Sequence, residues 1–585
     1  MKLEEVKLTI DGKDVVVEKG TTILEAAKKI NVDIPTLCYL KGINEVGNCR
    51  MCLVEIDGIK GFKAACVYPV ENNMVVRTNT KELIEIKKTI LQLILSSHEK
   101  KCLTCERNTN CRLQELCKKF NIDDLEYEGE MPEFEMDSSS ECIVRNMAKC
   151  VLCRRCVNIC KNVQNVCAIT NLNRGFNSKI GVALDMKIKH STCVGCGQCV
   201  IHCPVGALTE KSNITELREA LLDPQKHVVI QTAPAVRVAI GEEFGLPIGT
   251  LVQGEMVAAL RSLGFDKVFD TDLAADITIM EEATEFISRV KENKNLPMIT
   301  SCSSGWITFA EKFYPECLNH LSTTKSPMEI MGTLIKTYYA KEYNIDPKDI
   351  YSVALMPCSA KKAEIKRENL KLENGLQAVD NVITTRELAK LLKISNINLA
   401  LLAPEKYDNP FGIASGAGHI FGNTGGVMES ALRSMSYIID GTEIERIDFK
   451  NLRKNNGIKE AEIQIGNRKH IVAIVQGLKN VSMVLDEIKD GKSKYSFIEI
   501  MTCPGGCVNG GGQPIVDESK FSTEDVIKLR SSALYKADKN SKYRKSYQNP
   551  AVIEIYDKVF KTPNSKKAHK YLHTSYNKQE VYIDN

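Results

Sequence analysis

The chain has 585 residues, of which 43% are hydrophobic and 26% charged, a composition typical of a globular protein with about four domains. Its formal net charge of +4 is too small for a basic nucleic-acid surface, and no aromatic and arginine tracts are interleaved, so we expect no nucleic-acid partner. No run of about eighteen apolar residues and no signal-peptide core occurs, which predicts a cytoplasmic protein without a membrane partner.

The cysteine content is the most informative part of the composition. The chain has 23 cysteines, and many are only two or three residues apart. In a large protein without an export signal this spacing indicates metal ligation rather than structural disulfides.

Residues 3 to 17 alternate between apolar and polar positions around Asp11-Gly12 and predict a β-hairpin. Thr22 and Glu25 have capping-box spacing and predict the start of a helix. After it come four cysteines with the spacing C-x10-C-x2-C-x13-C, which are Cys38, Cys49, Cys52 and Cys66. Thiolates suit iron-sulfur clusters or zinc. We predict a ferredoxin-like 2Fe-2S domain over residues 1–80, although the spacing differs from the plant-type pattern and a structural zinc site is the alternative.

Residues 81 to 97 have helical periodicity and lead into H-x3-C-x2-C-x5-C, formed by His98, Cys102, Cys105 and Cys111. Three thiolates and one imidazole by themselves favour structural zinc. Because the motif lies between two other cluster motifs, we instead predict a 4Fe-4S cluster in a domain over residues 81–140.

Two copies of C-x2-C-x2-C-x3-C follow, in a predicted domain over residues 141–212. In two-cluster ferredoxins the fourth cysteine of each run ligates the other cluster. One predicted 4Fe-4S cluster is therefore held by Cys150, Cys153, Cys156 and Cys203, and its partner by Cys193, Cys196, Cys199 and Cys160. Two such fully ligated clusters conduct electrons and are not a reaction centre.

From about residue 225 apolar strand patterns, such as 227–230 and 353–356, alternate with helical patterns, such as 254–263 and 328–339. This alternation predicts an α/β domain with parallel sheets over residues 213–585. Three loops carry its distinctive residues: TSCSSGW at 300–306, MPCSAKK at 356–362 and MTCPGGCVNGGGQP at 501–514.

At these loops the chain resembles the catalytic domain of FeFe-hydrogenases, and the ordered cluster motifs resemble the large clostridial type. The resemblance implies a multidomain α+β and α/β fold, with a β-grasp ferredoxin-like domain, iron-sulfur modules and two parallel-sheet lobes around an H-cluster. This cofactor is a 4Fe-4S cube joined to a two-iron subsite that carries CO, cyanide and a dithiolate. The implied reaction interconverts H2 with protons and electrons. The implied partners are ferredoxin or a similar small electron carrier, and hydrogenase maturation proteins.

Site residues follow from the resemblance. Cys358, Cys503 and Cys507 match the cube ligands, and Lys361 matches a lysine that donates to a cyanide on iron. Residues that match the cavity lining are Ala233, Pro234, Met356, Phe421 and Met501. The expected proton path runs through Arg289, Glu285, Ser322 and Glu282 toward Cys302. Glu282, Glu285 and Arg289 are three and four residues apart, so on a helix they share a face, although a solvated face is the alternative.

The first loop departs from the family pattern. Relatives commonly have two adjacent cysteines there, the first a proton carrier and the second a cube ligand, whereas this chain has Cys302 and Ser303. Soft-ligand chemistry favours Cys302 as the ligand, but its ungapped position is that of the proton carrier. Either Cys302 binds the cube or Ser303 supplies an oxygen.

Two other classes of protein share part of these motifs. An electron-transfer subunit resembling that of respiratory complex I has the first two cluster modules but does not need the three late loops. A noncatalytic sensor or iron-sulfur assembly factor keeps a hydrogenase-like domain without the two-iron subsite. Ser303 favours this last reading, whereas Lys361, the glutamates and the GGCVNGGG loop favour the enzyme.

Overall fold

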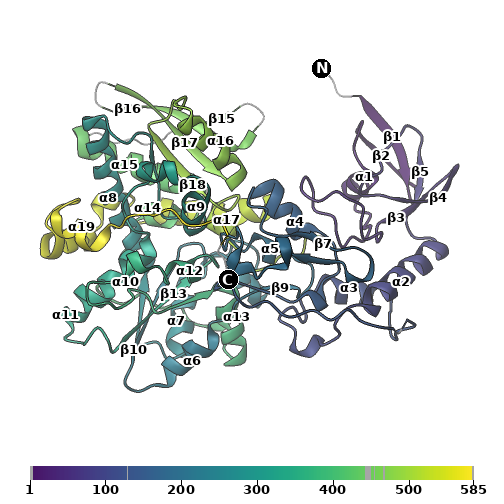
Figure 1. Ribbon diagram of the computed structural model, residues 1–585, viewed down its shortest axis with the longest axis horizontal. Coiled ribbons are helices and arrows are strands. Elements are labelled where there is room, and N and C mark those ends of the chain that lie inside the picture. Colours follow the sequence, from purple (N-terminus) through teal and green to yellow (C-terminus); the bar gives the residue numbers. More distant parts are fainter. Residues whose placement is uncertain are drawn as a thin grey trace.

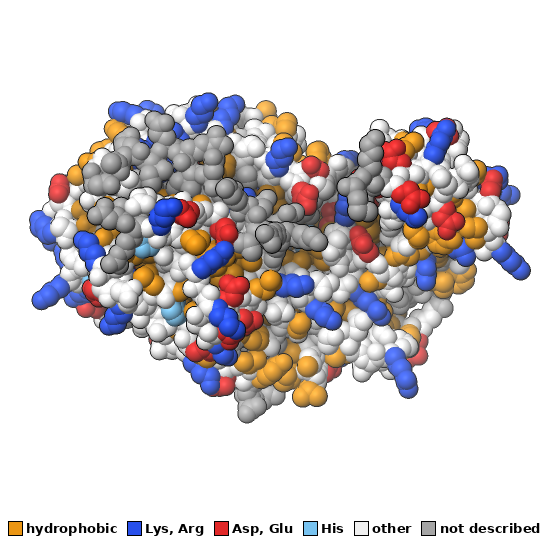
Figure 2. All heavy atoms as spheres, turned by 90° about the horizontal axis from the view of Figure 1, so that it is seen from above, with side chains coloured by type: hydrophobic (Ala, Val, Ile, Leu, Met, Phe, Trp, Pro, Cys, Tyr) orange, Lys and Arg blue, Asp and Glu red, His pale blue; other side chains and the backbone are white. Residues whose placement is uncertain are grey.

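The modules follow one another along the long axis of the molecule. The computed structural model describes residues 4–127, 129–441, 450–452, 455–465, 468–518 and 520–582. The N-terminal sheet lies at one end, the cysteine-rich modules lie next to it, and the two catalytic sheets with their helices form the larger body (Figure 1). The outline narrows between this body and the N-terminal module, and both signs of charge are mixed on the face seen in Figure 2. Among the described helices, none is both long and apolar enough to cross a bilayer.

The N-terminal module is a five-stranded sheet with the order β2-β1-β5-β3-β4. Its strands are β1 (Glu5–Ile10), β2 (Lys13–Glu18), β3 (Leu53–Ile56), β4 (Ile59–Ala64) and β5 (Val75–Arg77). The predicted hairpin is β1 with β2, and helix α1 (Ile23–Lys29) packs its apolar face on the sheet. The hydroxyl of Thr22 accepts from Glu25 N as expected, but the Glu25 carboxylate bonds to Tyr39 and Lys28 and does not complete the capping box.

Helix α2 (Lys81–Ser96) is the predicted helix ahead of His98, and α3 (Arg112–Lys119) begins directly after Cys111. The next module is built from two short two-stranded sheets, β6 (Ile143–Arg145) with β9 (Leu208–Glu210) and β7 (Thr170–Leu172) with β8 (Lys179–Gly181). Each cysteine run continues into a short helix, α4 (Arg155–Asn158) or α5 (Gln198–Ile201), preceded by a left-handed residue, Arg154 or Gly197. The two halves therefore repeat the same local structure.

The first catalytic sheet has the order β11-β10-β13-β14, and all its neighbours are parallel. Its strands are β10 (His227–Thr232), β11 (Lys267–Asp270), β13 (Ile350–Met356) and β14 (Asn381–Thr384). Helices α6 (Ile214–Leu222), α7 (Gln253–Ser262) and α13 (Thr385–Ile394) pack on one face. Helices α8 (Thr271–Glu292), α10 (Pro327–Leu334) and α18 (Pro550–Ile555) pack on the other. Both faces are buried, which explains the near-continuous apolar runs of its strands.

The second catalytic sheet has the order β12-β18-β17-β16-β15. Strands β12 (Met298–Ile299), β18 (Phe497–Met501) and β17 (Arg468–Gln476) are parallel, but β16 (Asn455–Ile465) and β15 (Lys450–Leu452) extend it antiparallel. The predicted parallel lobe is thus a mixed sheet. Only residues 466 and 467 separate β16 from β17, and so short a connection joins antiparallel strands, whereas a parallel pair requires a crossover.

Helix α8 connects the two lobes. Its residues Leu273 and Ile277 belong to the core of the first sheet, and Ile279, Ala283 and Phe286 to the core of the second. Helices α9 (Ser304–Phe313) and α16 (Leu478–Lys489) cover the other face of the second sheet, while α15 (Gly426–Asp440) packs beside α8. The loops that follow β10, β12, β13 and β18 leave the carboxyl ends of parallel strands, the edge at which α/β sheets place their functional residues.

Candidate functional site

The four cysteines after α1 lie together at the edge of the N-terminal sheet. The sulfurs of Cys52 and Cys66 are 3.3 Å apart, and the backbone N–H of Cys49 donates to Cys38 Sγ at 3.5 Å. The pKa of Cys66 is raised by its hydrogen bond with Cys52 and by burial, and the Cys38 and Cys49 thiolates add to this rise. All four sulfurs are therefore within electrostatic reach of one another, as a shared cluster requires.

His98 and the three cysteines that follow it are gathered between α2 and α3. His98 is buried, and its Nδ1 is a buried nitrogen without a hydrogen-bond partner. Burial raises the pKa of Cys111, and the Cys105 thiolate adds to the rise. A Cβ on Gly206 would lie 2.5 Å from Cys105 Sγ, so only glycine leaves that sulfur free. A buried imidazole nitrogen without a partner is a donor that a metal ion can use, as the predicted ligand role of His98 requires.

A cavity in the next module is lined by the four cysteines of the first predicted 4Fe-4S set. Cys150, Cys153, Cys156 and Cys203 face it together with Ile180, Val205 and Leu208. Cys203 comes from the second sequence run, so the cavity brings together the crossed combination of cysteines. Apolar walls and four thiols fit a fully ligated, water-excluded cluster.

The second set lies against the catalytic domain. The pKa of Cys199 is raised well above its usual value by burial and then by the thiolates of Cys193 and Cys160. Burial also raises the pKa of Cys196, and the next largest contribution comes from the thiolate of Cys503 in the catalytic loop. The last ferredoxin-type site therefore adjoins the catalytic centre.

Three thiols of the late loops converge between the two lobes. Cys358 follows β13 and Cys503 follows β18, and the pKa of Cys503 is raised by burial and then by the thiolates of Cys358 and Cys507. Burial and Cys358 also raise the pKa of Cys507 to about 12. The segment between Cys503 and Cys507 is a turn and not a helix, with φ of +83° at Gly505 and +90° at Gly506.

Glycine allows the chain to close around these thiols. A Cβ on Gly506 would lie 2.7 Å from Thr424 N and 2.9 Å from Asn423 C. The Gly510 Cβ position is occupied by the carbonyl oxygen of Pro357, which precedes Cys358. The glycines of the third loop thus bring the backbone after Cys507 into direct contact with the backbone before Cys358.

Cys302 and Ser303 occupy different surroundings. Burial, followed by the charges of Glu282 and Cys507, raises the pKa of Cys302 well above its usual value. Ser303 Oγ instead lies 2.8 Å from Thr502 Oγ1, next to Cys503 in sequence. The Cys302 thiol therefore lies on the side of α8, and the Ser303 hydroxyl on the side of the third loop.

Three of the expected proton-path residues are connected by polar contacts, and a fourth, Glu282, is buried on the same helix as two of them. Arg289 pairs with Glu285 at 2.6 Å, and Ser322 Oγ donates to Glu285 Oε2 at 3.0 Å. Glu282 is fully buried, and its carboxylate oxygens have no hydrogen-bond partner of normal length. Burial and the nearby Glu285 raise the pKa of Glu282 to about 8, although Ser322 opposes the rise. Glu282 is therefore largely protonated at neutral pH and able to donate a proton.

Lys361 is buried and pairs with Glu364, a residue that sequence reasoning missed. The Nζ to Oε2 distance is 2.8 Å, and Nζ also donates to the carbonyl oxygen of Cys302 at 3.3 Å. Burial acts to lower the pKa of Lys361, but Glu364 outweighs it and the pKa is raised. Glu364 in turn accepts from the hydroxyls of Ser304 and Ser326. The spacing of three residues between Lys361 and Glu364 was the available signal.

The residues expected to line the cavity are buried in the surrounding cores. Phe421 and Met501 share one apolar cluster with Cys302, and Ala233 and Met356 share another with Met328. Pro234 is buried beside Ala233. These side chains surround the region where the loops meet.

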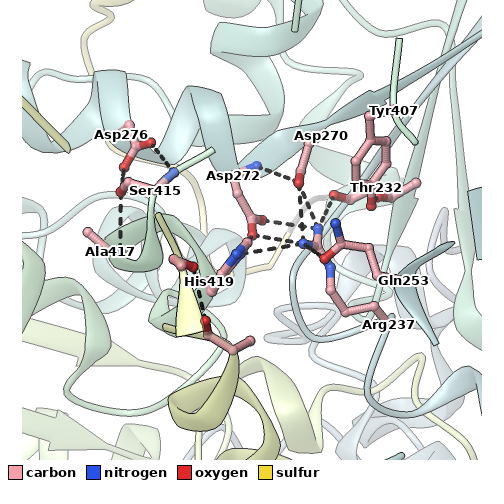
Figure 3. Close-up of polar contacts among 12 residues, drawn as sticks. Thr232, Arg237, Gln253, Asp270, Asp272, Asp276, Tyr407, Ser415, Ala417 and His419 are labelled. Carbon is pink, nitrogen blue, oxygen red and sulfur yellow. Dashed lines mark hydrogen bonds and ion pairs between the residues drawn. The ribbon is translucent and has the colours of Figure 1, made fainter. Parts of the chain in front are cut away.

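A buried ionic network fixes the loops on the far side of the same region (Figure 3). Arg237, which follows Ala233-Pro234, pairs with Asp270 at 2.7 Å and with Asp272 at 3.1 Å. His419 Nδ1 lies 2.6 Å from Asp272 Oδ2. Asp270 caps α8, and His419 lies in α14 (Gly416–Ile420), directly ahead of Phe421. The network ties together the β10 loop, the helix that carries Glu282, and α14.

Family models match nearly the whole chain. The iron only hydrogenase large subunit, C-terminal domain, matches residues 226–511, and the iron hydrogenase small subunit matches 524–579. Ahead of these, a 2Fe-2S iron-sulfur cluster binding domain matches residues 4–81. The iron-sulfur binding region of NADH-ubiquinone oxidoreductase-G matches 87–126, and a 4Fe-4S dicluster domain matches 149–207.

Curated relatives align along the full length. The NADP-reducing hydrogenase subunit HndD of Solidesulfovibrio fructosivorans is 44% identical over 98% of this chain and 99% of its own. Iron hydrogenase 1 of Clostridium pasteurianum is 41% identical over 98% of this chain and 100% of its own. Among solved structures, a variant of the apo FeFe-hydrogenase HydA1 from Chlamydomonas reinhardtii has a TM-score of 0.57 at 37% identity, covering 63% of this chain and 100% of that chain.

Fold and site together define an iron-sulfur oxidoreductase with a buried, thiol-lined reaction centre. The chain belongs to the FeFe-hydrogenases, with 2Fe-2S and 4Fe-4S modules ahead of an H-cluster domain. The assembly-factor alternative is not favoured, since the cytosolic Fe-S cluster assembly factor narfl of Xenopus tropicalis is 32% identical over only 67% of this chain. The complex I alternative explains residues 87–126 but not the catalytic domain.

Proposed function

We propose that this chain holds its H-cluster cube through Cys358, Cys503 and Cys507 and carries one 2Fe-2S and three 4Fe-4S clusters in the N-terminal modules. The single observation that carries the proposal is the mutual approach of these three thiols at the carboxyl ends of β13 and β18. When bound, the H-cluster supplies the iron centre at which dihydrogen is formed or split. The residues of the protein would position this centre, exclude water from it and deliver protons to it.

Protons reach the centre along α8 in this proposal. Arg289 and Glu285 form the entrance, Ser322 bridges, and Glu282 passes the proton to the Cys302 thiol. Support comes from the Arg289 to Glu285 contact of 2.6 Å and the Ser322 to Glu285 contact of 3.0 Å. The raised pKa of Glu282, about 8, matches a group that must both hold and release a proton near neutral pH.

Lys361 is proposed to direct its ammonium toward the anionic diatomic ligands of the two-iron subsite. Its buried charge is already balanced by Glu364, which sets the side chain in place. Because burial alone would favour the neutral amine, the Glu364 carboxylate keeps Lys361 charged and able to donate. Ala233, Pro234, Met356, Phe421 and Met501 are proposed to keep water from the subsite.

Electrons are proposed to enter through the N-terminal clusters and to leave the last of them near Cys196. Support comes from Gly197, which packs on Gly511, and from the charge of the Cys503 thiolate, which raises the pKa of Cys196. The proposed carrier is ferredoxin or a similar small protein. The 44% identity to an NADP-reducing hydrogenase subunit supports a second candidate, a partner subunit that exchanges electrons with NADP.

These two carriers are separated by assaying the purified chain alone. We expect hydrogen evolution with reduced ferredoxin and none with NADPH until a further subunit is added. Activity with NADPH in the chain alone contradicts the proposal that electrons arrive through a protein partner.

Infrared spectroscopy tests the cofactor proposal. The chain made together with hydrogenase maturation proteins should show CO and cyanide stretching bands and evolve hydrogen. The Cys507→Ala variant should lose both, because the shared sulfur is gone, while keeping the accessory clusters. A parent protein that holds its accessory clusters but has neither bands nor activity after maturation contradicts the function.

A further inference from the structure

Ser303 caps α9, yet its hydroxyl does not bond to that helix. An N-cap serine normally accepts a hydrogen bond from the second or third backbone N–H of its helix. Ser303 has cap-like backbone angles, with φ of −93° and ψ of 101°, but makes no side-chain cap bond. Its oxygen lies 2.8 Å from Thr502 Oγ1 and accepts from Thr502 N at 3.3 Å. The hydroxyl is thus held at the third loop, beside the residue that precedes Cys503.

Close packing maintains this contact. A Cβ on Gly305 would lie 3.0 Å from Thr502 Cγ2, so the first turn of α9 sits directly on Thr502. The carbonyl of Cys302 is bound by Lys361, which fixes the chain one residue earlier. Because neighbouring side chains of an extended segment point to opposite sides, Cys302 and Ser303 cannot exchange places without breaking these contacts.

The Cys302 side chain packs against the apolar cluster that α8 shares with the second sheet, which includes Ile279 and Ala283 on α8. The Cys302 side chain therefore lies on the side of α8, and the Ser303 hydroxyl on the side of the third loop.

We infer that Ser303 Oγ, and not Cys302 Sγ, is the fourth ligand of the cube, and that Thr502 holds this oxygen in place. The inference rests on the proposed function. The bond between iron and oxygen forms as the hydroxyl proton leaves to water, so no electron is transferred. The Thr502 N–H and hydroxyl then both donate to the bound oxygen, which compensates for the poorer match of oxygen to a soft iron-sulfur cube. Cys302 stays free to receive the proton of Glu282.

The inference is tested in the full chain made without maturation proteins, which carries its cubes but no two-iron subsite. Oxidised 2Fe-2S and 4Fe-4S clusters have no net spin, whereas a cube that has lost its weakly held iron becomes a paramagnetic 3Fe-4S cluster. After mild oxidation, Ser303→Ala should therefore gain about one spin per chain over the parent, since one iron has lost its protein ligand. Cys302→Ala and Ser303→Cys should remain at the parent level.

A gain in Cys302→Ala without one in Ser303→Ala overturns the inference, and so does a Ser303→Ala variant that shows no gain and keeps all its iron. Loss of the whole cube from Ser303→Ala, but not from Cys302→Ala, supports the inference equally. The spectra of the reduced accessory clusters show whether each variant is folded. The infrared experiment uses matured protein and is a separate test. The spin measurement can therefore still be interpreted if the proposed hydrogenase function is contradicted.

Discussion

Glu282 illustrates how one side chain acquires a chemical role from its surroundings. It lies on α8 where both lobes bury it, without a hydrogen-bond partner of normal length, and burial raises its pKa to about 8. On an exposed helix the same carboxylate would be ionised at neutral pH and unable to donate. Its role in the proposed proton path therefore depends on the two sheets that enclose it.

Glu282→Gln should reduce hydrogen turnover by about 10²- to 10⁴-fold, because the amide keeps the shape but carries no transferable proton. Infrared bands of the cofactor should be unchanged. Hydrogen evolution and infrared spectra of the same sample check this. The matched control is Glu292→Gln, an exposed glutamate on the same helix, which should keep full turnover. Near-normal turnover in Glu282→Gln rejects the path.

The contact between the elements β11, α8 and α14 depends on a balance of buried charges. Arg237 is opposed by Asp270 and Asp272, and a proton shared by His419 and Asp272 brings the group to neutrality. Burial acts to lower the pKa of His419, but the hydrogen bond and charge of Asp272 outweigh it and the pKa is raised. The folded pair thus keeps a proton that an unfolded histidine loses near pH 6.5.

The sign of the pH dependence follows from this proton. Where the folded state binds more protons than the unfolded state, stability falls as pH rises. The pair should therefore reduce the parent's stability as pH increases above about 6.5, contributing a slope of at most about 1.4 kcal/mol per pH unit for its one proton. Asp272→Asn and His419→Gln should flatten this decline.

Thermal unfolding under anaerobic conditions from pH 6 to 8.5 measures the effect. Asp557→Asn, which alters an exposed carboxylate on another element, should keep the parent's slope. An identical slope in the parent and in Asp272→Asn would show that the pair does not hold the proton.

The whole molecule is organised around the junction between the ferredoxin-type module and the catalytic loops. Ser359 Oγ donates to Gly195 O at 2.8 Å, and Gln198 Nε2 donates to Asn509 O at 2.8 Å. Gly197 packs against Ser359 Oγ, and a Cβ there would lie 2.9 Å from Gly511 Cα. This contact sets the approach of the last cluster to the cube.

Gly197→Ala should force the two modules apart and slow hydrogen evolution severalfold with reduced ferredoxin, the proposed donor of electrons to the N-terminal clusters. The control is Gly175→Ala in the same module. Its φ of +64° is close to the +70° of Gly197, but nothing lies within 4 Å of its Cβ position. Both variants have the backbone strain of an alanine in the left-handed region. Equal losses of hydrogen evolution would therefore show that strain, and not the junction, causes the effect.

The sequence by itself determined the local elements and predicted the cluster ligands. Periodicity located the hairpin at Asp11-Gly12, helix α2 and strands β10 and β13, because these depend on neighbours in the chain. The cysteine spacings predicted the cluster sets in chain order, and the crossed use of Cys203 agrees with the cavity in which it lies. Motif resemblance predicted the hydrogenase family, which the comparisons confirm.

Only the tertiary structure decided which distant groups meet. The bonds from Ser304 and Ser326 to Glu364 join segments far apart in the chain. The contact between Thr502 and Ser303 does the same. Likewise, the protonation state of a carboxylate, and the side of a cavity on which a thiol lies, depend on burial by other elements. A local sequence pattern carries no information about this burial. Ser303 departs from the family pattern in the sequence. Its inferred role as a cube ligand follows only from the structure, in which α9 and the third loop hold its oxygen.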